Sequence, residues 1–270
     1  AIDQGRVEEL RTRSEITLDS QRGLNVGYLA LNNDRSPFDD ARVRLAVARA
    51  LDRTRIVDSI LRGHGEPADT PLPPALSGPD LRGRQLLLDR DRARRLLSRA
   101  GLPSGFATTL AVSEAPRSYL PNPVGLAELV REDLARIGVR VRIRETATWA
   151  EHVGLTARGE FDMAVLGWLA DTLDPNDFLT VLLDSDSIGT TNRARYRSEE
   201  MDGLLRRARM ESAPRMRFAL YRRAQSLFDE EMPFVPLYHA SVFTARRREV
   251  EGLVVGPTGV LRFDKVWKTR

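Results

Sequence analysis

The chain has 270 residues, of which 42 are Lys or Arg and 38 are Asp or Glu, with 41% hydrophobic residues and no cysteine. This composition is typical of a folded protein with a substantial core, and it excludes a disordered chain, a collagen, a disulfide scaffold and any thiol chemistry. The apolar runs are too short for a membrane helix, which needs about 20 residues.

The sequence pI of 9.8 reflects the type of basic residue and not a basic patch. Only Lys265 and Lys268 are lysines, which leaves 40 arginines, and acidic residues are mixed among them, as at 89–92. Nucleic-acid binding would need basic clusters with interleaved aromatic residues. We therefore expect no nucleic-acid partner.

The spacing of apolar residues predicts alternating helices and strands. In chain order these are two helices within 39–61 that break near Asp52, a loop over 63–79, a helix over 89–100, a strand over 106–112, a loop over 113–123, a helix over 126–137, a strand over 139–143, a helix over 149–158, a strand over 161–168, helices over 199–210 and 214–231, and short strands over 234–237 and 242–245. The alternation between 106 and 168 is typical of a parallel α/β sheet. Ligands bind outside the carboxyl ends of such strands, so we expect ligand-binding loops at 113–123 and 168–177.

Several short segments form an ordered set that covers most of the chain. They are 25–32 (NVGYLALN), 36–46 (SPFDDARVRLA), 63–67 (GHGEP), 91–101 (DRARRLLSRAG), 134–139 (LARIGV), 167–178 (GWLADTLDPNDF), 221–225 (YRRAQ) and 233–237 (PFVPL). In this order they resemble the extracellular solute-binding proteins of peptide ABC importers, family 5, and above all the dipeptide-binding members.

The resemblance implies a type II periplasmic-binding-protein fold of class α/β. Members of the family are roughly double this length, and the chain resembles their C-terminal half. We expect 37–236 to form the second lobe, with a parallel-rich sheet flanked by helices. Residues 1–36 would be a remnant of the first lobe and hinge, and 237–270 a return to the first lobe. The two lobes would close about a hinge near 32–37 and 236–239.

A W-x-x-D element, Trp168 and Asp171, directly follows residues 161–167 and so lies at the carboxyl end of a predicted strand. The resemblance implies that Asp171 binds the α-ammonium group of a peptide, with Trp168 in the same site. A charged ammonium that leaves water needs an ionised partner to offset its desolvation. The alternative is that Asp171 is a loop acid or a helix cap and that Trp168 is an ordinary core residue.

The loop over 113–123 contains an R-x-Y-x-P-N stretch at 117–122. The resemblance implies that Arg117 binds the ligand carboxylate and that Tyr119 belongs to the same site. A guanidinium binds a carboxylate through two parallel hydrogen bonds, which fix orientation as well as charge. The alternative is a solvated Arg117, one of many arginines. Val165 stands where some oligopeptide binders carry Arg, which favours the dipeptide type of carboxylate site.

By resemblance, the protein is the peptide-binding component of an ABC importer in the periplasm or another extracytoplasmic place, and its partners are a peptide or other small solute and the permease subunits. Ala1 is not Met, so we expect any signal peptide to be removed or absent. No catalytic motif occurs, and His64, His152 and His239 lack metal-ligand spacing, so we expect no enzyme activity, cofactor or catalytic metal. The alternatives are a non-peptide solute (a sugar, nickel complex, haem or opine) and a sensor or interaction module without transport.

Overall fold

The computed structural model of the protein describes residues 2, 6–78, 81, 83–256 and 260–269. At its centre lies a seven-stranded sheet in the order β1-β7-β2-β6-β4-β5, with β3 paired to β7 beside this path. The strands are β1 (Ile16–Arg22), β2 (Asn25–Leu31), β3 (Gly65–Pro67), β4 (Ala107–Ser113), β5 (Arg140–Thr146), β6 (Met163–Leu169) and β7 (Phe234–Arg247). The sheet is mixed, because β4 runs parallel to β5 and β6 whereas the other pairs are antiparallel.

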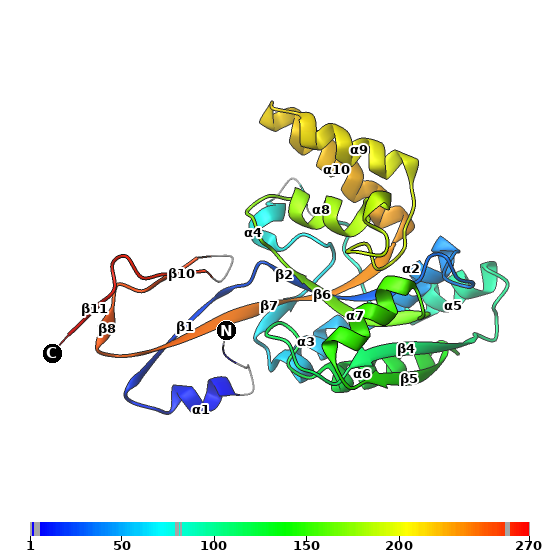
Figure 1. Cartoon of the computed structure of the whole chain (residues 1–270). Helices are drawn as coiled ribbons and strands as arrows, with labels where there is room; N and C mark the ends of the chain where they lie inside the picture. Colours follow the sequence, from blue (N-terminus) through cyan, green and yellow to red (C-terminus); the bar gives the residue numbers. More distant parts are fainter. Residues whose placement is uncertain (1, 3–5, 79–80, 82, 257–259, 270) are drawn as a thin grey trace.

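Helices cover this sheet from both sides. In the view of Figure 1, α8, α9 and α10 gather above the strands, while α3 and α6 lie below them. The helices are α1 (Val7–Arg11), α2 (Ala41–Ala50), α3 (Arg53–Leu61), α4 (Pro74–Ser77), α5 (Arg90–Arg99), α6 (Pro123–Ala135), α7 (Trp149–Arg158), α8 (Asn176–Leu183), α9 (Glu199–Met210) and α10 (Pro214–Glu231), with a short 3-10 turn η2 (Ser185–Ser187). The predicted α/β class is confirmed.

The unit β4-α6-β5-α7-β6 follows the predicted alternation of strand and helix. Side chains at the helix starts explain the sharp turns, since Asn122 accepts a hydrogen bond from the backbone N–H of Gly125 and Thr148 accepts one from Glu151. At its other end α7 stops at Gly159, whose φ of 72° suits a residue without a Cβ. Because β4 pairs in parallel with both β5 and β6, the carboxyl ends of all three strands lie at one edge of the sheet.

The two short strands predicted over 234–237 and 242–245 are in fact one continuous strand, β7. The residues between them stay extended because strands from elsewhere in the chain pair with them: β3 pairs with Tyr238 to Ala240, and β1 pairs from Ser241 onward. The helix α8 was not predicted, because its apolar run over 178–183 is too short to distinguish a helix from a buried strand by periodicity.

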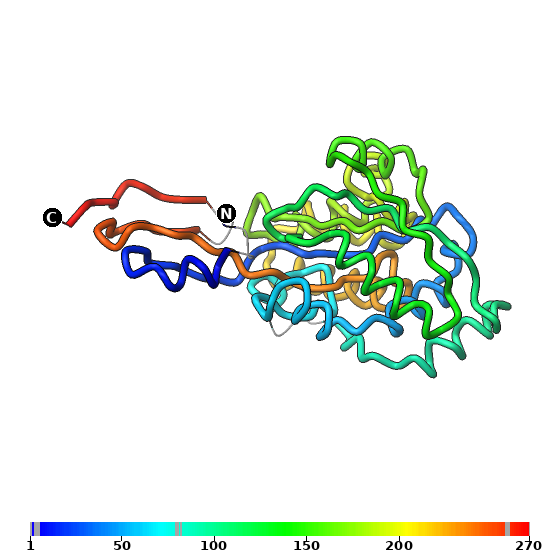
Figure 2. Tube along the Cα trace, turned by 90° about the horizontal axis from the view of Figure 1, so that it is seen from below, coloured from blue at the N-terminus to red at the C-terminus, as the bar shows by residue number. Residues whose placement is uncertain are grey.

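Among the described residues, the hydrophobic core cluster begins at Leu24 and ends at Ala240. β2 lies at its centre, and all seven of its residues are buried. Beyond these limits β1 and the distal half of β7 run out together as a long arm, which also carries α1 and the short strands (Figures 1 and 2). The short strands are β8 (Val250–Glu251), β9 (Val254–Val255), β10 (Leu261–Arg262) and β11 (Trp267–Lys268).

This compact body is longer at both ends than the lobe expected over 37–236. Asn32 is buried, and its side-chain amide donates to the carbonyls of Gly159 and Phe161 at 3.1 and 2.8 Å. The segment 236–239 lies within β7 and pairs with β2 and β3. Both segments expected to form the hinge therefore lie inside the body.

Candidate functional site

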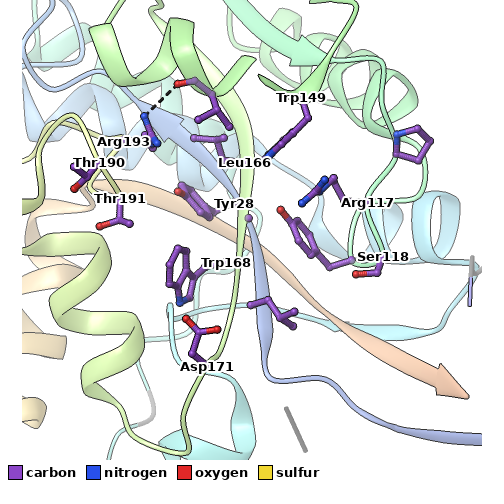
Figure 3. A pocket seen from close by; sticks show the side chains of 15 residues that line it. Tyr28, Arg117, Ser118, Trp149, Leu166, Trp168, Asp171, Thr190, Thr191 and Arg193 are labelled. Carbon is purple, nitrogen blue, oxygen red and sulfur yellow. Dashed lines mark hydrogen bonds between the residues drawn. The ribbon is translucent and has the colours of Figure 1, made fainter. Parts of the chain in front are cut away.

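A pocket of about 490 Å³ opens at the edge of the sheet where the parallel strands end. Its walls come from β2, β6, the loop after β4, the first turns of α7 and the loop before α9 (Figure 3). The lining residues are Tyr28, Pro116, Arg117, Ser118, Tyr119, Trp149, Val153, Leu166, Gly167, Trp168, Leu169, Asp171, Thr190, Thr191 and Arg193. All four residues expected at the site, Arg117, Tyr119, Trp168 and Asp171, line this one pocket.

Arg117 is held in place by a tight turn and an aromatic ring. The backbone N–H groups of Arg117 and Leu120 each donate to the other residue's carbonyl at 2.9 Å. The Arg117 guanidinium carbon lies 4.7 Å from the centroid of the Trp149 ring, a cation–π contact that restrains the side chain. No acidic side chain within the described ranges pairs with Arg117. The guanidinium is thus positioned but not neutralised.

Tyr119 forms a wall of the pocket and packs closely on β6. A Cβ built on Gly167 would lie 2.2 Å from Cε2 of the Tyr119 ring, so the ring needs a glycine at that position. Burial raises the pKa of the Tyr119 phenol, and the Arg117 charge offsets part of this effect. The phenol is therefore neutral at physiological pH.

Three acidic residues follow β6, and the structure separates their roles. Asp174 forms a two-pronged ion pair with Arg217 at 2.8 and 2.9 Å. The Asp177 carboxylate accepts the backbone N–H groups of Asp171 and Thr172 at 2.5 and 2.8 Å. Asp171 is exposed, and its carboxylate has no hydrogen-bond or ion-pair partner among the residues described. Asp171 is therefore neither a helix cap nor half of an internal ion pair.

Trp168 lies next to the end of β6 and lines the same pocket. Its indole Nε1 is buried and meets no acceptor in the described part of the chain. Packing, and not a hydrogen bond, therefore holds the ring, which presents an apolar surface to the pocket (Figure 3).

Among the side chains of this pocket that sequence reasoning missed are Tyr28, Trp149 and Arg193. Trp149 begins α7, directly after β5, so the same rule about carboxyl ends of strands would have found it. Arg193 lies in the loop before α9, and no motif marks it. Its Nη1 donates to the carbonyls of Val153 at 3.2 Å and Gly189 at 3.4 Å. Burial lowers the pKa of Arg193, and the neighbouring Tyr28 phenol opposes that shift.

Among the described residues, no three His, Cys, Asp or Glu side chains lie close enough together to hold a metal ion. Over the same residues, no helix has both the length and the apolar character needed to cross a membrane.

A mixed α/β body with an open pocket at its strand ends is typical of a ligand-binding α/β domain. The chain belongs to the bacterial extracellular solute-binding proteins, family 5, whose middle-region profile matches residues 1–190. The type II periplasmic-binding-protein fold is thereby confirmed, as is the resemblance to the C-terminal half of its members.

Relatives of this chain are named as binding proteins for different ligands. Heme-binding protein A of Haemophilus influenzae is 35% identical over 251 residues, covering 93% of this chain and 46% of that protein. Di/tripeptide-binding protein 2 of Pseudomonas aeruginosa is 35% identical over 261 residues, covering 96% and 49%. A crystal structure of a dipeptide-binding protein from a Pseudoalteromonas species, in complex with Met-Leu, superposes with a TM-score of 0.86 at 32% identity, covering 98% and 52%. The chain spans about half the length of these relatives.

Proposed function

We propose that the protein is the solute-binding component of an ABC importer, that it acts in the periplasm or an equivalent extracytoplasmic space, and that it binds di- or tripeptides. One observation supports this most strongly: Asp171 and Arg117, an acid and a base that have no oppositely charged partner among the described residues, line one pocket. Relatives named as di/tripeptide-binding proteins favour the same solute. The proposal gives the protein a binding role and no catalytic step.

In this proposal Asp171 binds the ligand's α-ammonium group and Arg117 binds its carboxylate. Each ligand charge leaves water when the cleft closes, and a charge-assisted hydrogen bond to an opposite charge offsets that cost. The Trp149 ring keeps the Arg117 guanidinium in place before ligand arrives, which reduces the entropy lost on binding. Tyr119 and Trp168 supply apolar walls between the two charges. Recognition of the peptide's termini leaves its side chains less restricted.

The pocket needs a second wall, which we assign to a first lobe. The described arm outside 24–240 exposes several large apolar side chains, which are Val254, Val260, Leu261, Phe263 and Trp267. Exposed apolar residues gathered on a segment with little core of its own are typical of a surface that packs against another part of a protein. We infer that this arm belongs to the first lobe.

The limits of the core suggest where the lobes meet. Only two connections leave the body towards the arm, the turn at Gly23 between β1 and β2, and β7 at Ala240 to Ser241. We propose that the hinge lies at these two points and that the second lobe covers 24–240. Closure about them would bring the first lobe over the pocket, and the closed form would engage the permease subunits.

Titration of the natural full-length protein tests this function. Trp149 and Trp168 line the pocket, so their fluorescence should change when a dipeptide binds. We expect saturable binding of dipeptides, and weaker or no binding of haem, a nickel complex, an opine and a sugar. Asp171→Asn should weaken dipeptide binding, whereas Asp58→Asn, at an exposed acid on α3, should leave it unchanged. Tight binding of a non-peptide solute with no response to dipeptides would refute the proposal.

A further inference from the structure

The charges that line the pocket are unequal. Asp171 is its one acidic residue, while both Arg117 and Arg193 line it. A zwitterionic peptide bound by Asp171 and Arg117 would leave the charge of Arg193 without a partner. In Figure 3 the three charged side chains enter from three different sides, with Arg193 next to Tyr28.

Arg193 is anchored on one side and open on the other. Its Nη1 bonds to the carbonyls of Val153 and Gly189, which ties the guanidinium to α7 and to its own loop. The preceding residue in the chain, Asn192, is buried and its amide donates to the carbonyls of Asp184 and Tyr196, so the loop is fixed. Within the described ranges, Nε and Nη2 of Arg193 meet no acceptor and no acidic side chain approaches.

Tyr28 supplies a second donor at this place. The residue is 3% exposed and lines the pocket from β2, and its hydroxyl forms no hydrogen bond to any described residue. Burial raises the pKa of the Tyr28 phenol well above its ordinary range, and the nearby Tyr119 adds to that shift. The phenol therefore keeps its proton at physiological pH and can donate it to an acceptor.

A half-buried cation without an anion is unfavourable, because no counter-charge offsets the free energy of its partial desolvation. A ligand carboxylate would offset that desolvation by binding the free Nε and Nη2 edge of Arg193, whose fork geometry matches a carboxylate. We propose that Arg193 and the Tyr28 hydroxyl form a subsite for a second carboxylate, so that the pocket prefers short peptides with an Asp or Glu side chain. This proposal rests on the peptide-binding function proposed above and names its substrate class.

A purely structural role for Arg193 is the competing explanation, and Arg49 provides the matched control. Arg49 is also largely buried, and its Nη1 likewise donates to two backbone carbonyls, those of Gln85 and Leu87, away from the pocket. If Arg193 only ties backbone segments together, Arg193→Met and Arg49→Met should both lower stability without changing which peptide is preferred.

Calorimetry on the natural full-length protein tests the subsite with matched peptides, Ala-Ala, Ala-Glu and Ala-Gln. We expect Ala-Glu to bind at least about tenfold more tightly than Ala-Gln, in line with one hydrogen-bonded charge pair. Arg193→Met should abolish that ratio and leave Ala-Ala affinity nearly unchanged, Tyr28→Phe should reduce the ratio severalfold, and Arg49→Met should preserve it.

The outcomes separate this proposal from the function on which it rests. Equal affinities for Ala-Glu and Ala-Gln in the unmodified protein would overturn the acidic preference while peptide binding stands, and this result needs no variant to fold. An equal loss for all three peptides in Arg193→Met would assign Arg193 a structural role and also overturn the subsite. Failure of every peptide to bind would overturn both proposals.

Discussion

The carboxylate of Asp177, in the first turn of α8, accepts the backbone N–H of Asp171 at 2.5 Å, so one acid positions another. Asp177 is 8% exposed and also accepts the N–H of Thr172, whereas the Asp171 carboxylate points outward without an internal partner. The loop after β6 is thus built to present a single free carboxylate to the pocket.

Asp177 is therefore expected to act on binding through Asp171. Asp177→Ala should lower the free energy of unfolding by about 1–3 kcal/mol, the usual cost of buried donors left unpaired. It should also weaken peptide binding, because the Asp171 loop loses its anchor. Denaturant unfolding and calorimetry measure the two effects. Asp186→Ala, at an exposed acid in η2, is the control and should change neither quantity.

Gly167 controls the position of the Tyr119 ring. Its replacement should disturb the side of the pocket that we propose binds the ligand carboxylate. Gly167→Ala places a Cβ 2.2 Å from that ring, so we expect a loss of about 1–3 kcal/mol of stability from overpacking. Displacement of Tyr119 should also shift the Arg117 turn and weaken binding.

Gly203 provides the control for this change. It lies in α9 with no atom within 4 Å of a built Cβ, so Gly203→Ala should stabilise the protein by about 0.5–1 kcal/mol. If Gly167→Ala has the same stability and affinity as the parent, the Tyr119 ring does not pack against Gly167 as the structure has it.

His239 should make stability depend on pH. Burial lowers the pKa of His239 from 6.5 to about 4, while its Nδ1–H donates to the carbonyl of Asn25 at 2.7 Å. The unfolded chain takes up a proton below pH 6.5 and the folded one does not. The stabilisation is therefore complete above pH 6.5 and is lost as the pH falls towards 4.

Comparison with His239→Asn isolates this effect from that of Asp229, whose pKa burial raises to about 6 and whose contribution has the opposite sign. Between pH 7 and 4.5 the parent should lose about 2 kcal/mol more than the variant in urea unfolding. Parallel stability curves for the two proteins would show that His239 titrates normally in the folded state.

The proposed lobe limits can be tested by trimming the chain. A fragment over 23–241 keeps every described member of the core cluster and should unfold cooperatively. A fragment over 37–236 lacks β2, which lies between β6 and β7 at the centre of the sheet, and should not fold. Circular dichroism during thermal unfolding distinguishes them. Cooperative unfolding of the shorter fragment would support the boundaries expected from the sequence and contradict those proposed here.

The parallel part of the fold could be predicted because local signals mark it. Asn122, Thr148 and Gly159 begin or end helices by their own side-chain or backbone chemistry, and the apolar spacing between them is regular. Neither the continuity of β7 nor the inclusion of β2 in the body has such a local signal. Both depend on pairing between strands far apart in the sequence: β7 pairs with β1 and β3, and β2 pairs with β6 and β7.

The candidate site divides in the same way. The sequence could place Arg117, Tyr119, Trp168 and Asp171 together because they lie at or after the carboxyl ends of two neighbouring parallel strands and belong to short motifs. Arg193 could not be placed in this way, because its loop follows η2 and leads into α9. That loop does not directly follow a strand of the sheet. The role of Arg193 depends on two backbone carbonyls and on the lack of an acidic neighbour, neither of which a sequence displays.

The most direct test of the central claim changes the ligand and Asp171 together. Calorimetry on the natural full-length protein would compare a dipeptide with its N-acetylated form, in the parent and in Asp171→Asn. In the parent we expect acetylation to weaken binding at least about a hundredfold, because it leaves a desolvated carboxylate unpaired. In Asp171→Asn the same change should cost less than about threefold, since no charge pair remains to be lost. An equal cost of acetylation in both proteins would contradict the assignment of the peptide ammonium group to Asp171.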